Sequence, residues 1–243
     1  MGVFDSRRTS GRSNSIEKSE AKLILSDKTP WPVQEAYKAL RTNITFSLPG
    51  TGCKVIAVSS AQQHDGKSTI CINTAISFAQ INKKVLLMEC DLRLPTVGTK
   101  LGIRSVPGLS DTLIGSAQIS EALRRNVRKG LDVLPAGNIP PDPTWLLQSN
   151  QMNVLIQQFR KLYDYILIDL PPVTSVADAS IISRYADGFL MAVRHQVTEM
   201  PALEDALAQL HLAEAKILGF VYNNVTSEGG HYYKGYYKGY YKK

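Results

Sequence analysis

A loop suited to binding phosphate follows the first apolar run of the chain. Residues 61–68 read AQQHDGKS and come directly after CKVIAVSS, residues 53–60. Such a loop needs backbone amides that point inward, a helix N-terminus behind them, a lysine that reaches the β- and γ-phosphates and a hydroxyl that faces Mg²⁺. Gly66 permits close approach of the backbone, Lys67 supplies the charge and Ser68 supplies the hydroxyl. The predicted nucleotide-binding residues of this loop are Asp65, Gly66, Lys67, Ser68 and Thr69.

Three carboxylates follow two further apolar runs. Glu89 and Asp91 stand at the end of KVLLMEC, and Asp169 ends YDYILID before two prolines that stop a strand. Mg²⁺ prefers oxygen ligands and keeps several waters, so one or two carboxylates near a phosphate loop are enough to hold it. Together with Lys67 and Ser68, these side chains are typical of a site for metal and phosphate.

Apolar runs alternate with amphipathic segments along most of the chain. Strands are expected at 53–60, 84–90, 131–137, 163–170, 188–195 and 216–224, and helices at 34–46, 67–81, 108–125, 143–160, 177–186 and 199–213. This pattern predicts an α/β fold of the P-loop NTPase type, with a mostly parallel central sheet and helices on both faces. Ligands of such sheets bind beyond the carboxyl ends of the strands, where Lys67, Asp91 and Asp169 are expected.

The 243 residues are enough for one large α/β domain. We predict a flexible basic arm at 1–30, a P-loop domain at 31–226 that begins with a helix, and a mobile tail at 227–243. The formal net charge is +7, but much of it lies at the two ends of the chain. Two short basic arms are weak grounds for nucleic-acid binding, so no nucleic-acid partner is expected.

Composition also indicates a cellular compartment. The three cysteines, Cys53, Cys71 and Cys90, lie in or beside apolar runs without ligand spacing, which favours buried thiols. No stretch approaches the roughly 18–20 apolar residues of a membrane span, and no apolar signal region opens the sequence. The chain is therefore expected in the cytoplasm.

The chain ends on tyrosines that have no apolar neighbours to pack against. Residues 232–243 read YYKGYYKGYYKK and hold six of the eleven tyrosines. From the residues alone, this segment could be a basic aromatic arm that stacks on nucleic acid or polysaccharide.

Four segments carry a family resemblance that gives the tail a different role. In their order and spacing, DGKST, LLMECDLRLPT, VLPAGNIPPDP and YDYILIDLPPV resemble the bacterial tyrosine kinases of capsule and exopolysaccharide assembly. The resemblance implies transfer of the γ-phosphoryl group of ATP to tyrosine, with regulation of polysaccharide polymerisation and export. It implies that the catalytic residues are Lys67, Glu89, Asp91 and Asp169, and that Mg²⁺ is held by Ser68, Glu89 and Asp169. It also implies that Asn223, in GFVYNN, contacts the adenine base.

The same resemblance implies an assembly. The family carries a Glu-x-x-Arg-x-x-Arg helix that builds a ring, in which the tail of one subunit enters the site of its neighbour. The corresponding oligomerisation residues here are Glu35, Lys38 and Arg41, and the implied phosphoacceptors are Tyr232, Tyr233, Tyr236, Tyr237, Tyr240 and Tyr241. A separate transmembrane activator, which would bring the protein to the membrane, and a cognate tyrosine phosphatase are the other implied partners.

The sequence departs from the family pattern at three positions. His64 and Glu89 replace a glycine and an aspartate, and Lys38 replaces an arginine and so lacks its bidentate fork. If the backbone at His64 requires a positive φ, the histidine is strained there. Two alternatives stay open. One is a partition or septum-positioning ATPase, a class that carries a lysine where this chain has Gln62. The other is a nucleotide-binding scaffold without activity.

Overall fold

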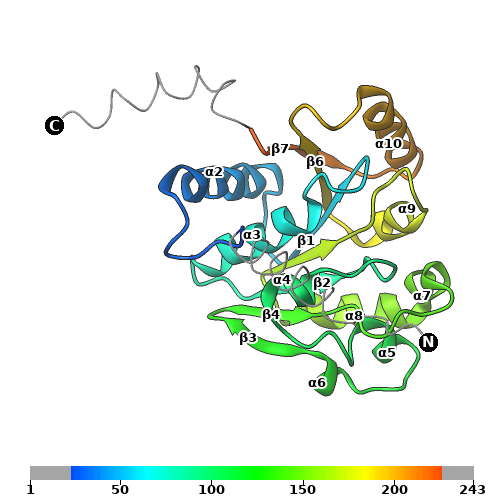
Figure 1. Ribbon diagram of the computed structural model, residues 1–243. Coiled ribbons are helices and arrows are strands. Elements are labelled where there is room, and N and C mark those ends of the chain that lie inside the picture. Colours follow the sequence, from blue (N-terminus) through cyan, green and yellow to red (C-terminus); the bar gives the residue numbers. More distant parts are fainter. Residues whose placement is uncertain (1–22, 226–243) are drawn as a thin grey trace, which may run out of the picture.

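A seven-stranded sheet forms the centre of the protein in the computed structural model, which describes residues 23–225 (Figure 1). The strand order is β3-β4-β2-β5-β1-β6-β7. Neighbouring strands run parallel except β3, which is antiparallel to β4. The predicted α/β fold with a mostly parallel sheet is confirmed.

The strands coincide closely with the apolar runs of the sequence. Their bounds are β1 (Lys54–Ser60), β2 (Val85–Glu89), β3 (Arg124–Arg128), β4 (Leu131–Leu134), β5 (Tyr165–Asp169), β6 (Gly188–Arg194) and β7 (Ile217–Asn223). Strands β1, β2 and β5 are buried almost throughout, because helices cover both faces of the sheet. Only β3 was not predicted, since its sequence, RRNVR, lies at the exposed edge and has no apolar run.

Helices pack on both faces of this sheet (Figure 1). They are α2 (Trp31–Ser47), α3 (Lys67–Ala79), α4 (Val97–Leu101), α5 (Leu109–Leu113), α6 (Ile119–Ala122), α7 (Pro143–Gln148), α8 (Asn150–Arg160), α9 (Asp178–Ile182), the 3₁₀ turn η1 (Ser183–Tyr185) and α10 (Met200–Leu212). One core contains residues of α2, α3 and α4, and the other contains residues of α5 to α10. Among the described residues, no helix is both long and apolar enough to cross a membrane.

Two expected helices are divided in the structure. The helix expected at 108–125 is wrong: α5 ends before Gly115, which has a φ of 79°, and a short α6 and then β3 follow. The carboxylate of Asp111 accepts hydrogen bonds from Gly108 and Asn138, a tertiary contact that holds α5 against the loop after β4. The segment at 143–160 breaks at Ser149, which ends α7 and caps α8 by accepting a bond from the backbone N–H of Met152.

Residues 23–25, which the sequence placed in a flexible arm, pack against α3. Ile24 and Leu25 are buried in the core of that face. Asn73 of α3 fixes this segment, because its Oδ1 accepts a bond from the Leu25 N–H (2.8 Å) and its Nδ2 donates to the Leu23 carbonyl (3.0 Å). The apolar pair thus belongs to the domain.

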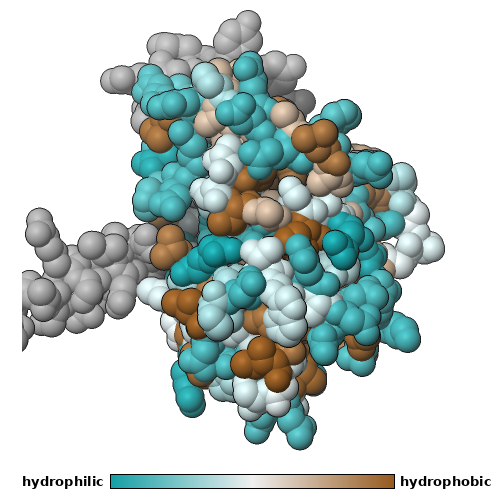
Figure 2. Space-filling view, turned by 90° about the vertical axis from the view of Figure 1, so that its right-hand side faces the viewer, coloured by the Kyte–Doolittle hydropathy of each residue, from teal (hydrophilic) through white to brown (hydrophobic). Residues whose placement is uncertain are grey.

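The molecular surface is largely polar on the side that carries α7, α9 and α10. Figure 2 shows that face, with polar side chains over most of it and apolar ones in small groups. Exposed apolar residues of these helices include Trp145 and Leu212.

Candidate phosphate and metal site

The carboxyl ends of three strands lie side by side and define the site. Val58 of β1 pairs with Asp169 of β5, which pairs in turn with Glu89 of β2. Because these strands are parallel, the loops that follow them lie at one edge of the sheet. Neighbouring strands are about 4.8 Å apart, so these loops are close together. The P-loop, Asp91 and Asp169 are therefore brought together by the order of the strands.

The P-loop connects β1 to α3 and leaves the helix N-terminus open. Gly66 precedes the first residue of α3, Lys67, and has a φ of 94°. A Cβ atom at Gly66 would lie 2.1 Å from Asn223 Nδ2, so no other residue fits without a shift. Thr69 is half-buried in the first turn of α3. Free amides at the start of a helix are suited to phosphate, which fits the predicted nucleotide.

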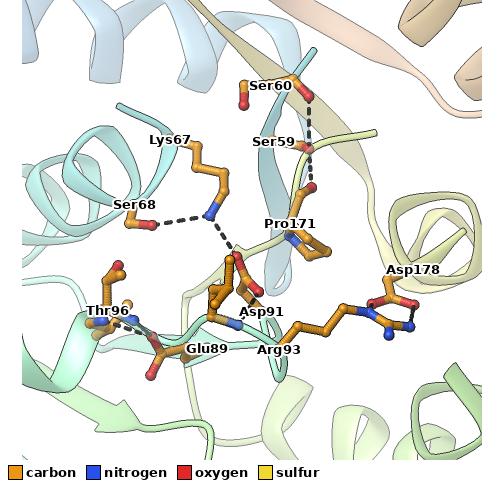
Figure 3. Close-up of polar contacts among 12 residues, drawn as sticks. Ser59, Ser60, Lys67, Ser68, Glu89, Asp91, Arg93, Thr96, Pro171 and Asp178 are labelled. Atoms are coloured by element: carbon orange, nitrogen blue, oxygen red, sulfur yellow. Dashed lines mark hydrogen bonds and ion pairs between the residues drawn. The ribbon is translucent and has the colours of Figure 1, made fainter. Parts of the chain in front are cut away.

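Lys67 points across the site to Asp91 (Figure 3). Its Nζ lies 2.8 Å from Asp91 Oδ2 and 3.4 Å from Ser68 Oγ. Burial alone would lower the pKa of Lys67, but the charges of Asp169 and Asp91 outweigh it and raise the pKa above its usual value. Lys67 therefore remains a cation at neutral pH and can attract phosphate.

Asp169, at the end of β5, is a buried carboxylate. Its side chain is fully buried, and among residues 23–225 no group forms a regular hydrogen bond to either oxygen. Burial raises its pKa, while the charge of Lys67 and the neighbouring hydroxyl of Ser68 oppose the rise. A buried anion without regular hydrogen bonds is suited to a cation. The chemistry of Ser68 and Asp169 thus fits Mg²⁺.

Protein side chains alone do not enclose a metal in the described part of the chain. No group of three or more His, Cys, Asp or Glu residues there is arranged to hold an ion. Mg²⁺ commonly takes only one or two protein ligands and completes its shell with phosphate and water. A site of that kind matches the oxygen atoms of Ser68 and Asp169 beside the P-loop.

Glu89, predicted to act in catalysis and metal binding, faces backbone amides. Its Oε1 accepts bonds from the N–H groups of Thr96 (2.6 Å) and Val97 (2.7 Å), and its Oε2 accepts one from Ala136 (3.2 Å). Burial raises the pKa of Glu89 to about 7, although these amides oppose the rise. Glu89 thus fixes the loop that carries Asp91 (Figure 3).

That loop has a second anchor, which the sequence did not reveal. Arg93 lies 3.3 Å from the buried carboxylate of Asp178 and donates to the Thr144 hydroxyl at 2.9 Å. Within the loop, the Leu94 N–H donates to Asp91 Oδ1 at 3.0 Å, so the other carboxylate oxygen remains on Lys67. Arg93 belongs to a recognisable motif, but nothing in the sequence pairs it with Asp178.

Two residues predicted to bind the nucleotide form hydrogen bonds that support the P-loop. Asp65 is fully buried, and its carboxylate accepts bonds from the Thr198 hydroxyl and the Gln62 N–H. Asn223, the predicted adenine contact, donates through Nδ2 to the Asp65 carbonyl at 2.9 Å. His64 has a φ of 68°, which meets the condition under which strain is expected at this histidine.

The predicted oligomerisation residues lie on α2, but they do not share one environment. Glu35 and Lys38 form an exposed ion pair of 2.7 Å within the helix. Arg41 turns inward and donates to the carbonyl of Ser77 on α3 at 2.6 Å. Arg41 therefore holds α2 on α3 within one subunit. The six predicted phosphoacceptor tyrosines, 232–241, lie outside the described residues.

Comparison with known proteins finds relatives that match most of this chain. The AAA domain family matches residues 53–218. Tyrosine-protein kinase YwqD of Bacillus subtilis is 35% identical over 236 residues, which cover 96% of each chain. Tyrosine-protein kinase CpsD of Streptococcus agalactiae is 34% identical over 218 residues, which cover 89% of this chain and 91% of the relative.

Solved structures agree with this grouping. The chimerical protein CapA2B2 has a TM-score of 0.80 and 29% identity, and the match covers 84% of this chain and 90% of that one. The kinase domain of the Escherichia coli tyrosine kinase ETK has a TM-score of 0.76 and 28% identity, over 79% of this chain and 75% of that one. The septum site-determining protein MinD of Pyrococcus horikoshii, complexed with Mg-ADP, shares the fold with a TM-score of 0.59 and 22% identity over 69% of each chain.

Proposed function

Because the chain belongs to the family of bacterial tyrosine-protein kinases, we propose that it phosphorylates its own C-terminal tyrosines in trans within a homo-oligomer. The predictions of the family and of a tyrosine kinase activity are confirmed by the relatives. The proposed acceptors are Tyr232, Tyr233, Tyr236, Tyr237, Tyr240 and Tyr241. The observation that carries the proposal is the Lys67–Asp91 ion pair of 2.8 Å beside the buried carboxylate of Asp169.

The roles of the site residues follow from their contacts. Lys67, charged and held at 2.8 Å from Asp91, attracts the phosphates of ATP. Ser68 and Asp169 would hold Mg²⁺, which neutralises charge on the phosphates when bound. Asp91 orients the tyrosine hydroxyl and accepts its proton as the oxygen bonds to the γ-phosphorus and ADP leaves. Tyrosine has an unperturbed pKa near 10, so a carboxylate acceptor assists this step at neutral pH.

Glu89 supports this chemistry through its bonds to backbone amides. Its three backbone contacts fix the loop on which Asp91 stands. In the proposal it is therefore a positioning residue, and Ser68 and Asp169 are the metal ligands. Aspartate, which the family resemblance places at this position, is one methylene shorter.

The proposed physiological role is regulation of capsular or exopolysaccharide polymerisation and export. The family resemblance supports it, together with a transmembrane activator, a cognate phosphatase and a location in the cytoplasm at the membrane. The alternative of a septum-positioning ATPase has only the shared fold in its favour. Gln62, where that class carries a lysine, accepts a bond from the Glu199 N–H and so braces the P-loop.

Mapping of phosphorylated residues after incubation with Mg-ATP tests the proposal. Phosphate should appear on the tail tyrosines of the wild type and be absent from Lys67→Met, which keeps an unbranched stem but loses the charge. Lys83→Met is the matched control, because Lys83 is exposed at the other end of β2. Unchanged tail phosphorylation in Lys67→Met would refute the assignment. ATP turnover without tail phosphorylation would favour the ATPase.

A further inference from the structure

Side chains from segments distant in sequence form hydrogen bonds to His64 and Asp65 of the P-loop. The Thr198 hydroxyl, in the loop between β6 and α10, donates to Asp65 Oδ1 at 2.8 Å. Asn223, at the end of β7, donates to the Asp65 carbonyl at 2.9 Å, and Arg194 of β6 donates to the His64 carbonyl at 3.1 Å. These partners lie more than 125 residues from the P-loop in sequence, so the contacts are tertiary.

One of the residues held in this way, His64, has a strained backbone. His64 and Gly66 both have left-handed φ angles, 68° and 94°, on either side of Asp65. Glycine adopts such angles freely, but a residue with a Cβ does so at a cost and stays there only when its surroundings fix it. The surroundings here are the bonds to Asp65 and to the His64 carbonyl.

The Thr198 hydroxyl forms two hydrogen bonds. It accepts a bond from the Arg194 N–H at 2.7 Å and donates its own hydrogen to Asp65. A hydroxyl can do both at once, and a methyl group can do neither. Since Asp65 is fully buried, loss of this donor leaves a carboxylate oxygen without a partner.

We propose that Thr198 and Asn223 are positioning residues for the nucleotide phosphates. They act through Asp65 as a clamp, which keeps the P-loop in the strained shape that opens the amides at the start of α3. This inference rests on the proposed nucleotide binding. It assigns to Asn223 a task on the loop backbone rather than on the adenine base, since its Nδ2 is bonded to the Asp65 carbonyl.

Affinity for Mg-ADP, measured by calorimetry, is the first test. Thr198→Val should weaken binding about tenfold or more, because a hydrogen bond to a charged, buried group is lost. Thr198→Ser keeps the hydroxyl and should bind within about twofold of the wild type. Unchanged affinity in Thr198→Val overturns the proposal, and so does a failure of Thr198→Ser to restore binding.

Amide hydrogen exchange in the nucleotide-free protein gives a second, independent reading. Exchange at residues 62–66 should be faster in Thr198→Val than in the wild type, while amides of β5 stay protected in both. If the wild type fails to bind Mg-ADP, the proposed function fails. The difference in exchange between Thr198→Val and the wild type at residues 62–66 still decides whether the clamp exists. Should Thr198→Val not fold, Asn223→Ala removes the other donor, and equal exchange in that variant and the wild type overturns the clamp.

His64→Gly distinguishes a clamp from a general structural contact. Glycine adopts the left-handed angle without strain, so the loop of this variant depends less on being held. The loss of Mg-ADP affinity caused by Thr198→Val should therefore be several-fold smaller in the His64→Gly background. Equal losses in both backgrounds would show that Thr198 does not hold the strained residue.

Discussion

Glu89→Asp tests whether this carboxylate anchors a loop or takes part in the reaction. Aspartate is one methylene shorter, which withdraws the carboxylate by about 1.5 Å. The distances from Glu89 Oε1 to the amides of Thr96 and Val97 are 2.6 and 2.7 Å, so both bonds would open beyond hydrogen-bonding reach. A buried amide left without a partner costs about 1–3 kcal/mol, and two of them imply about 4 kcal/mol of lost stability.

Urea unfolding of the nucleotide-free protein measures this loss. With a slope of about 3 kcal/mol/M, the midpoint of Glu89→Asp should fall by about 1.3 M. Glu89→Gln is the control of equal length: its oxygen can still accept the Thr96 and Val97 bonds, while its NH₂ group meets the Ala136 N–H. The control should therefore lose about half as much. A midpoint for Glu89→Asp within about 0.3 M of the wild type, together with changed phosphorylation, would refute the anchoring role and make Glu89 a reacting group.

Three further predictions concern charge and assembly. Since burial raises the pKa of Glu89 to about 7, the folded state keeps a proton that the unfolded state has lost. The wild type should therefore lose stability relative to Glu89→Gln as the pH rises from about 4.5 to 7, by at most about 3 kcal/mol; parallel unfolding curves across this range would contradict the shift. Asp169→Asn removes a buried charge whose oxygens accept no regular hydrogen bond within residues 23–225, so the nucleotide-free protein should be no less stable to heat. The thermal shift caused by Mg-ADP should lose its Mg²⁺ dependence in this variant, and retained dependence would make Asp169 structural. Arg41→Ala should lower stability in urea by about 1.5–3 kcal/mol through the lost bond to Ser77, and Lys38→Ala by less than about 0.5 kcal/mol. An unchanged midpoint in Arg41→Ala, with a lower oligomer mass by light scattering, would show instead that Arg41 faces a neighbouring subunit.

The sequence predicts those parts of the fold that depend on local pattern. Strands β1, β2 and β5 are buried on both faces and therefore appear as continuous apolar runs. Strand β3 lies at an edge, where burial imposes no pattern, and could not be recognised. The expected helix at 108–125 failed because Asp111 bonds to Asn138, and no local signal indicates that contact.

The same distinction between local pattern and tertiary contact applies to the residues of the candidate site. Lys67 and Asp169 could be predicted because P-loop chemistry requires those residue types directly after strands. The partners of the other carboxylates could not, because they come from elsewhere in the fold. Glu89 is bound by amides of two different loops, and Asp65 by a hydroxyl 133 residues away. From the sequence alone, Glu89 and Asp65 could equally well have contacted the nucleotide directly.

The two edges of the sheet differ in their capacity to pair with another strand. Strand β3 contains three arginines, and repulsion between such charges discourages a second chain from adding to that edge. Strand β7 reads ILGFVYN, contains no charged residue, and exposes Phe220 and Tyr222. Within residues 23–225 it pairs with β6 alone. Strand addition is thus opposed by charge at the β3 edge and unopposed by charge within β7 at the other edge.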